Sequence, residues 1–172
     1  LLIANEAYKD VFYLENNSAD FYNYKGIICY TKVSNNNLLV GFRGTYWKNV
    51  NQILIDISQL AGISPGYIIA VGIIATLSEK YPNKKIIICG HSLGGGLGQF
   101  AATPFANNAE AYCFNSAGLF PDTSKILKRI SRQNTNITHV RLNNDWVSMF
   151  GRLYGDIYTI PFKGDCYKSH LI

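Results

Sequence analysis

One serine of this chain stands in a pattern that can turn a hydroxyl group into a nucleophile. Residues 90–94 read GHSLG and follow directly on an apolar run at 86–89, with a small-residue segment after them. A GxSxG sequence holds its serine on a sharp turn between a buried strand and a helix, and its glycines let the two elements pack closely. The run has neither the spacing nor the lysine of a P-loop. We therefore predict that Ser92 is a nucleophile, against the alternative of an incidental serine in a glycine-rich turn.

A serine hydroxyl needs a nearby base to take its proton, and a histidine commonly does this. The chain has three histidines. His91 adjoins the serine and is expected to point elsewhere on the turn, and His139 is expected to be a packed or surface residue of a strand. His170 follows the last predicted strand in a loop, and it is the predicted base.

The histidine in turn needs a carboxylate, which in a strand–turn–helix nucleophile arrangement lies between the serine and the histidine in the chain. Asp145 comes just after a predicted strand at 137–142, at the carboxyl end where catalytic groups gather in open α/β sheets. Asp165 is the second choice. Asp122 is expected to be a helix N-cap, and Asp156 opens a strand at the wrong edge of the sheet.

The reaction would also need hydrogen-bond donors for a negatively charged oxygen. One is expected to be the backbone N–H of Leu93, the residue after the nucleophile. The other should come from a loop that follows an earlier strand, and the turn Arg43-Gly44-Thr45 is placed suitably. A plain strand-ending turn is the alternative for that segment.

The elements that must position these residues alternate between helix and strand. Helices are predicted at 1–14, 49–61, 65–81, 93–106 and 121–132, and strands at 26–33, 38–43, 84–89, 110–115, 137–142 and 156–162. The first two strands form a hairpin, whereas the later alternation calls for a parallel sheet covered by helices. We predict an α/β fold with a mixed, mostly parallel sheet in a single domain over residues 1–172.

Composition excludes several classes of protein. With 172 residues, 48% hydrophobic and 16% charged, the chain can bury one sizeable core. The net charge of +5 is scattered, with no groove-reading motif, so it favours anionic surfaces such as membrane headgroups rather than nucleic acid.

The four cysteines lack metal-binding spacing and are expected to be buried thiols of a reducing compartment. Two uncharged stretches, 57–78 and 86–109, are long enough to span a membrane but are interrupted by polar or turn residues and are predicted to be core.

Four segments together resemble the class 3 lipases, the fungal triacylglycerol lipase-like family. They are GFRGT at 41–45, GHSLGG at 90–95, NDWV at 144–147 and the histidine at 170, and they occur in the family's order. The resemblance covers about residues 20–172, the stretch that holds all four motifs. It implies an α/β-hydrolase fold and the hydrolysis of carboxylic esters of acyl lipids by the triad Ser92, Asp145 and His170, without a metal or cofactor. It also implies that Thr45 joins Leu93 as a donor to the oxyanion.

Other parts of the chain refine this resemblance. The NSAG run at 115–118 is closer to bacterial or viral relatives than to the secreted fungal enzymes, and Trp146 stands where the family usually has proline. Residues 46–63 match the amphipathic lid of the family but are short. A phospholipase or thioesterase with the same triad remains an alternative, as does a non-catalytic membrane-binding domain that retains the fold. The expected partners are an acyl-lipid or ester substrate and a peripheral membrane surface.

Overall fold

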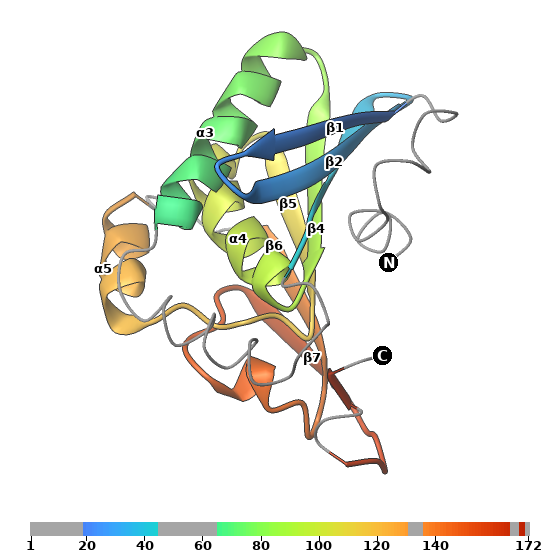
Figure 1. The fold of residues 1–172 in the computed structure, drawn as a ribbon, viewed down its shortest axis with the longest axis vertical. Helices are drawn as coiled ribbons and strands as arrows, with labels where there is room; N and C mark the ends of the chain where they lie inside the picture. Colours follow the sequence, from blue (N-terminus) through green and yellow to red (C-terminus); the bar gives the residue numbers. More distant parts are fainter. Residues whose placement is uncertain (1–18, 45–64, 131–135, 166–168, 171–172) are drawn as a thin grey trace.

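A computed structural model of the chain describes residues 19–44, 65–130, 136–165 and 169–170. The predicted helices at 1–14 and 49–61 and the lid-like segment at 46–63 lie outside these described residues. Within them, seven strands form one sheet in sequence order, as Figure 1 shows. The strands are β1 (Ala19–Tyr24), β2 (Ile27–Ser34), β3 (Asn37–Phe42), β4 (Lys85–His91), β5 (Ala109–Phe114), β6 (Ile137–Leu142) and β7 (Asp156–Ile160).

The sheet is mixed. β1, β2 and β3 pair in antiparallel fashion, and every later neighbour pairs in parallel. The antiparallel strands need only tight turns, whereas each parallel pair requires a longer crossover that returns the chain to the same end. The predicted fold class, an α/β fold with a mixed, mostly parallel sheet, is therefore confirmed. All parallel strands end at one edge, which we call the carboxyl edge.

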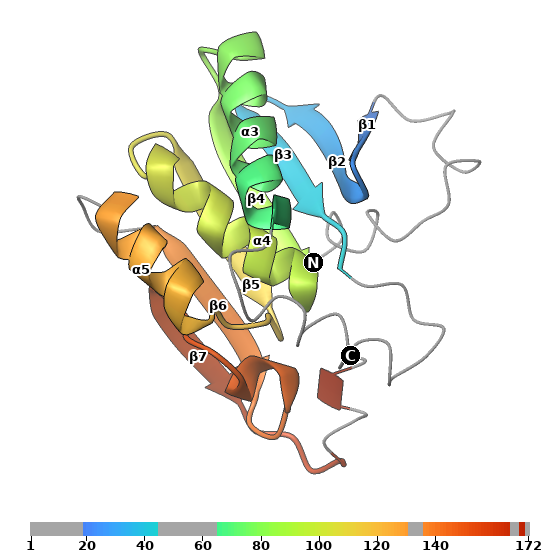
Figure 2. The same cartoon turned by 60° about the vertical axis from the view of Figure 1, so that its left-hand side comes forward.

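Three helices of the described residues lie in the crossovers. They are α3 (Pro65–Lys80), α4 (Leu93–Ala102) and α5 (Pro121–Ile130). Figures 1 and 2 both show them on the same face of the sheet, with α4 lying over β4 and β5. Beneath α3 and α4, alternate residues of β3 and β4 are fully buried, because successive side chains of a strand point to opposite faces. This layer includes Leu38, Val40, Phe42, Ile86 and Ile88.

Some predicted boundaries differ from the structure. β1 was not predicted; its aromatic residues pair along β2 as an edge strand. The helix predicted at 93–106 ends at Ala102 and continues as a 3₁₀ turn, Thr103–Phe105, because Pro104 has no N–H to extend the helical ladder. Asp122 is not an N-cap, since α5 begins one residue earlier and Asp122 forms an ion pair with Lys125 within its first turn.

The cysteines of the described residues are free and buried: Cys29, Cys89 and Cys113. Burial raises the pKa of the Cys29 and Cys89 thiols to about 12, so both are protonated and unreactive at neutral pH. Cys166 lies outside the described residues. None of the helices that the structure describes has the length and apolar character needed to cross a membrane.

Candidate active site

The predicted nucleophile lies at the carboxyl edge, between the end of β4 and the start of α4. Ser92 is buried and has a φ of 56° and a ψ of −127°, a left-handed backbone conformation that is costly for a residue with a side chain. Neighbouring glycines make the turn possible. A Cβ on Gly90 would lie 2.3 Å from the carbonyl carbon of Gly94, and a Cβ on Gly94 would lie 2.3 Å from the carbonyl oxygen of Phe42. The turn therefore packs directly against the end of β3.

Backbone hydrogen bonds hold this turn rigidly. The carbonyl oxygen of Ser92 accepts N–H groups from Gly95 and Gly96 in α4, at 3.1 and 3.2 Å, and from Ala117 at 3.0 Å. The N–H of Ser92 donates to the carbonyl of Phe114 at the end of β5. The strained conformation is thus fixed from the helix on one side and from the neighbouring strand on the other.

Three side chains from distant parts of the chain form a hydrogen-bonded row. The Nε2 atom of His170 lies 2.8 Å from the Ser92 hydroxyl, and its Nδ1 atom lies 2.6 Å from Oδ1 of Asp145. A carboxylate can only accept, so Nδ1 carries the proton and Nε2 accepts the hydroxyl of Ser92. The structure thus brings together the three residues that the sequence singled out, and the row can move a proton from the hydroxyl to the imidazole.

Asp145 is fully buried just beyond the carboxyl end of β6. Burial would by itself raise the pKa of this carboxyl, but the hydrogen bond and charge interaction with His170 and the hydrogen bonds from Ser148 hold the pKa below its usual value. The backbone N–H of Ser148 donates to Oδ2 at 2.9 Å, while Oδ1 faces the imidazole. Both carboxylate oxygens are therefore occupied, and the group stays ionised and fixed in place.

His91 does not point elsewhere on the turn, as the sequence suggested. Its ring lies 4.8 Å from the ring of His170, and its Nε2 atom lies 2.8 Å from the carbonyl oxygen of His170. A carbonyl can only accept, so His91 donates the proton. Burial and the neighbouring His170 lower the pKa of His91 to about 4. His91 is thus a neutral donor that anchors the backbone of His170.

Asn115 was not identified as a site residue, although it belongs to the NSAG run. Its φ of 40° places it in a left-handed conformation at the end of β5. Its Nδ2 atom donates to the carbonyl of Ser169 at 2.8 Å, and its Oδ1 atom accepts the N–H of Leu142 at 2.9 Å. One buried amide therefore joins the segment that carries His170 to the strand end that precedes Asp145. The local signal was an asparagine directly after a strand, where the left-handed conformation is tolerated.

The remaining predicted residues lie as follows. Leu93 is the first residue of α4, so its N–H belongs to the helix N-terminus, where the first four N–H groups have no partner inside the helix. Thr45 lies outside the described residues, one position after Gly44. Asp165 is exposed, and its backbone carbonyl accepts the N–H of Ser169. Trp146 places its ring 6.0 Å from that of His170.

A second buried serine also contacts a histidine. The Ser116 hydroxyl lies 2.8 Å from Nδ1 of His139, and Nε2 of His139 lies 2.9 Å from the carbonyl oxygen of Tyr154. His139 is 1% exposed, so of the two alternatives that the sequence left open, a packed or a surface strand residue, the structure shows the packed one. The Tyr154 carbonyl must accept, so Nε2 carries the proton and Ser116 donates to Nδ1.

Comparison with known proteins agrees with this architecture. A family model described as a Tle-like phospholipase domain matches residues 15–167. Lipase II from Rhizopus niveus superposes with a TM-score of 0.53 at 14% identity, over 85% of this chain and 70% of the lipase. A Rhizomucor miehei lipase, in complex with its propeptide, gives 0.52 at 15% identity over 92% of this chain and 62% of its own.

The Lip2 lipase of Yarrowia lipolytica gives a TM-score of 0.55 at 12% identity, over 85% of this chain and 66% of that lipase. The chain therefore spans between about three fifths and seven tenths of the length of these lipases. At such low sequence identity, the superpositions show a shared fold alone. No curated protein sequence matches the chain. The resemblance to class 3 lipases inferred from the sequence motifs is confirmed.

Proposed function

The chain belongs to the family of Tle-like phospholipase domains, and from that premise we propose that it is a serine carboxylic ester hydrolase acting on acyl lipids. The observation that carries the proposal is the row of Ser92, His170 and Asp145, with separations of 2.8 and 2.6 Å. Each of the three groups has the partner that its chemical task requires. The lipase fold of the structural neighbours supports the same reaction class.

The proposed reaction has two halves. His170 removes the hydroxyl proton while the Ser92 oxygen bonds to the ester carbonyl carbon, and the carbonyl electron pair moves to its oxygen. The tetrahedral species collapses, the bond to the alcohol breaks, and the alcohol takes the proton from His170. Water then attacks the acyl-enzyme with His170 again as base, the bond between the acyl carbon and the Ser92 oxygen breaks, that oxygen takes the proton back from His170, and the fatty acid leaves. Asp145 stabilises the imidazolium that forms in each half.

The negative oxygen needs donors that are in place before the reaction. We assign this role to the N–H of Leu93, at the positive end of α4. Thr45, three residues after the end of β3 in the sequence, is proposed as the second donor. The contact between Gly94 and the Phe42 carbonyl supports this assignment, because it brings the end of β3 against the nucleophile turn.

The family description favours a phospholipid as the first substrate to test, with triacylglycerols and simple esters next. Thioesters would use the same triad, so acyl-coenzyme A belongs in the same panel. A peripheral contact with a lipid surface is part of the proposal, since such substrates are presented at an interface. Release of fatty acid from mixed micelles of each lipid ranks these candidates directly.

The decisive experiment labels the nucleophile. A fluorophosphonate probe should modify the wild-type protein at one serine, and the Ser92→Ala variant should remain unlabelled with kcat lowered by roughly 10⁶-fold. The matched control is Ser116→Ala, which removes the other buried serine that contacts a histidine and should remain labelled. Full esterase activity in Ser92→Ala would refute the proposal. Liposome binding without labelling would favour the non-catalytic membrane-binding domain instead.

A further inference from the structure

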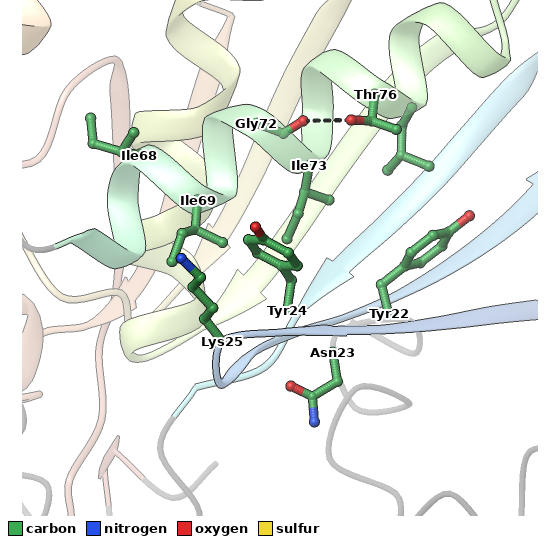
Figure 3. Close-up of a pocket in the computed structure, with 10 residues that line it drawn as sticks. Tyr22, Asn23, Tyr24, Lys25, Ile68, Ile69, Gly72, Ile73 and Thr76 are labelled. Atoms are coloured by element: carbon green, nitrogen blue, oxygen red, sulfur yellow. Dashed lines mark hydrogen bonds between the residues drawn. The ribbon is translucent and has the colours of Figure 1, made fainter.

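An apolar groove lies away from the triad, between β1 and α3. It has a volume of about 660 Å³, within the range of small-molecule sites. Figure 3 shows Tyr22 and Tyr24 pointing from β1 toward α3, while Asn23 points to the other side. The helix contributes aliphatic side chains, among them Ile69 and Ile73. The groove is therefore walled by aromatic rings on one side and by branched aliphatic groups on the other.

One end of the groove lies at the carboxyl edge. The N–H of Arg43, just after β3, donates to the carbonyl of Ile28, so the start of β2 is level with the end of β3. The hairpin turn between β1 and β2 is next to that start. The end of β3 also contacts Gly94 of the nucleophile turn. The groove thus opens on the edge of the sheet that carries Ser92, at about three interstrand spacings from β4, or roughly 14 Å.

A glycine keeps the groove open. Gly72 is exposed in the middle of α3 and lines the groove, and a Cβ built on it would meet nothing within 4 Å. Packing therefore does not require a glycine there, although glycine in an exposed helix interior is less favourable than alanine. Gly72 thus lowers the stability of α3 relative to alanine, and it leaves open space at the groove.

A lysine marks the end of the groove at the carboxyl edge. Lys25 lines the groove and has a left-handed φ of 49°, a conformation that is unfavourable for lysine. Its Nζ atom lies 5.6 Å from the centre of the Tyr24 ring, and no carboxylate of the described residues is within ion-pair distance of it. Lys80, by contrast, lies 3.2 Å from the hydroxyl of the lining residue Tyr22 and forms an ion pair with Asp20 at 3.4 Å. Only the Lys25 end therefore offers an uncompensated positive charge among the described lining residues.

From these observations we propose that the groove binds one long-chain fatty-acid anion, with its chain along α3 and its carboxylate at Lys25. An apolar groove that ends in one uncompensated cation fits an amphiphile with a single negative head group. The proposal deepens the proposed function and rests on it for the source of the ligand, because hydrolysis of an acyl lipid releases this anion at the same edge of the sheet. Binding itself does not require the triad.

The test measures oleate binding to Ser92→Ala protein by calorimetry, so that turnover cannot interfere. One equivalent of oleate should bind. Gly72→Phe in the same background should weaken binding at least tenfold by filling the groove, whereas Gly72→Ala should change it less than threefold. Ile157→Phe, on the exposed surface of β7, serves as a control for added apolar surface and should leave binding unchanged.

The role of the charge is tested with Lys25→Gln. This variant should weaken oleate binding about fivefold and leave the binding of oleyl alcohol unchanged. Wild-type affinity in Gly72→Phe, or equal effects of Lys25→Gln on the acid and the alcohol, would overturn the proposal. Probe labelling of Ser92 with no oleate binding would overturn only the groove, and oleate binding with no labelling would overturn only the hydrolase.

Discussion

Two buried serine–histidine pairs among the described residues have the same separation, and they differ in their third partner and in their backbone. Ser92 and His170 are 2.8 Å apart, and so are Ser116 and His139. Both serines are at most 2% exposed. A short serine–histidine hydrogen bond therefore does not by itself identify a nucleophile, because the third partner and the backbone decide what the pair can do.

The third partners have different charges. His170 faces the Asp145 carboxylate, which stabilises an imidazolium, whereas His139 faces the neutral carbonyl of Tyr154. Burial lowers the pKa of His139 to about 4, with the charge of Arg141 acting in the same direction. His139 therefore remains neutral at physiological pH and cannot hold a proton taken from a serine.

The backbones differ as well. Ser92 occupies a strained turn at the N-terminus of α4, where N–H groups are available to a developing oxyanion. Ser116 lies beneath that turn, since a Cβ built on Gly95 would be 2.4 Å from the Cβ of Ser116. We therefore interpret the Ser116–His139 pair as structural support for the turn that carries the proposed nucleophile.

We expect the largest change in kcat when His170 is given a neutral third partner like that of His139. Asp145→Asn keeps the shape of the side chain but removes the charge, and an amide can hold the wrong tautomer of His170. We expect kcat to fall by about 10⁴-fold with little change in KM. Steady-state hydrolysis of a nitrophenyl ester measures this. A fall of less than tenfold would show that the two pairs do not differ through their third partner.

An intermediate effect concerns stability in acid. The pKa of His139 is about 4 in the folded protein, against about 6.5 when unfolded, so the unfolded chain binds more protons between these values. The free energy of unfolding should therefore fall as pH drops from 6.5 to 4, by up to about 1.4 kcal/mol per pH unit for this histidine. The contribution of His139 to the free energy of unfolding is fully retained above pH 6.5.

His91, whose pKa is also about 4, contributes a second effect of the same sign. His139→Gln should consequently remove part of the acid sensitivity and leave the His91 contribution. Urea unfolding at pH 7, 6 and 5 gives the dependence of the free energy of unfolding on pH for the wild-type and variant proteins. Equal slopes would mean that His139 titrates normally, contrary to its buried, neutral assignment.

The smallest effect is expected for Ser116→Ala. The change leaves Nδ1 of His139 without its donor, which costs about 1–2 kcal/mol of unfolding free energy. Because Ser116 takes no part in the proposed reaction, kcat should stay within about threefold of wild type. Thermal unfolding and ester hydrolysis on the same preparation separate the two readouts. A large loss of kcat at unchanged stability would place this serine in the reaction instead.

Much of the fold could be predicted, because the spacing of apolar residues and the residues that begin or end helices and strands are local features of the sequence. Strand β4 was visible as an apolar run and α3 as a helix that begins at Pro65. β1 was missed because an edge strand needs no regular apolar face. The residues placed at the site were those with a motif or a position at a strand end. Asn115 and the inward orientation of His91 depend on contacts with a segment more than fifty residues away, which no local pattern encodes.

The amide of Asn115 has an evolutionary consequence. Because it bonds to both Leu142 and Ser169, the two segments share one partner, and a shift in either is felt by the other. Replacements along these segments should therefore combine non-additively, as expected for residues in one hydrogen-bond network. Among descendants of this sequence, changes near the acid and near the imidazole are expected to arise as coupled pairs, so that epistasis rather than independent drift governs this part of the chain.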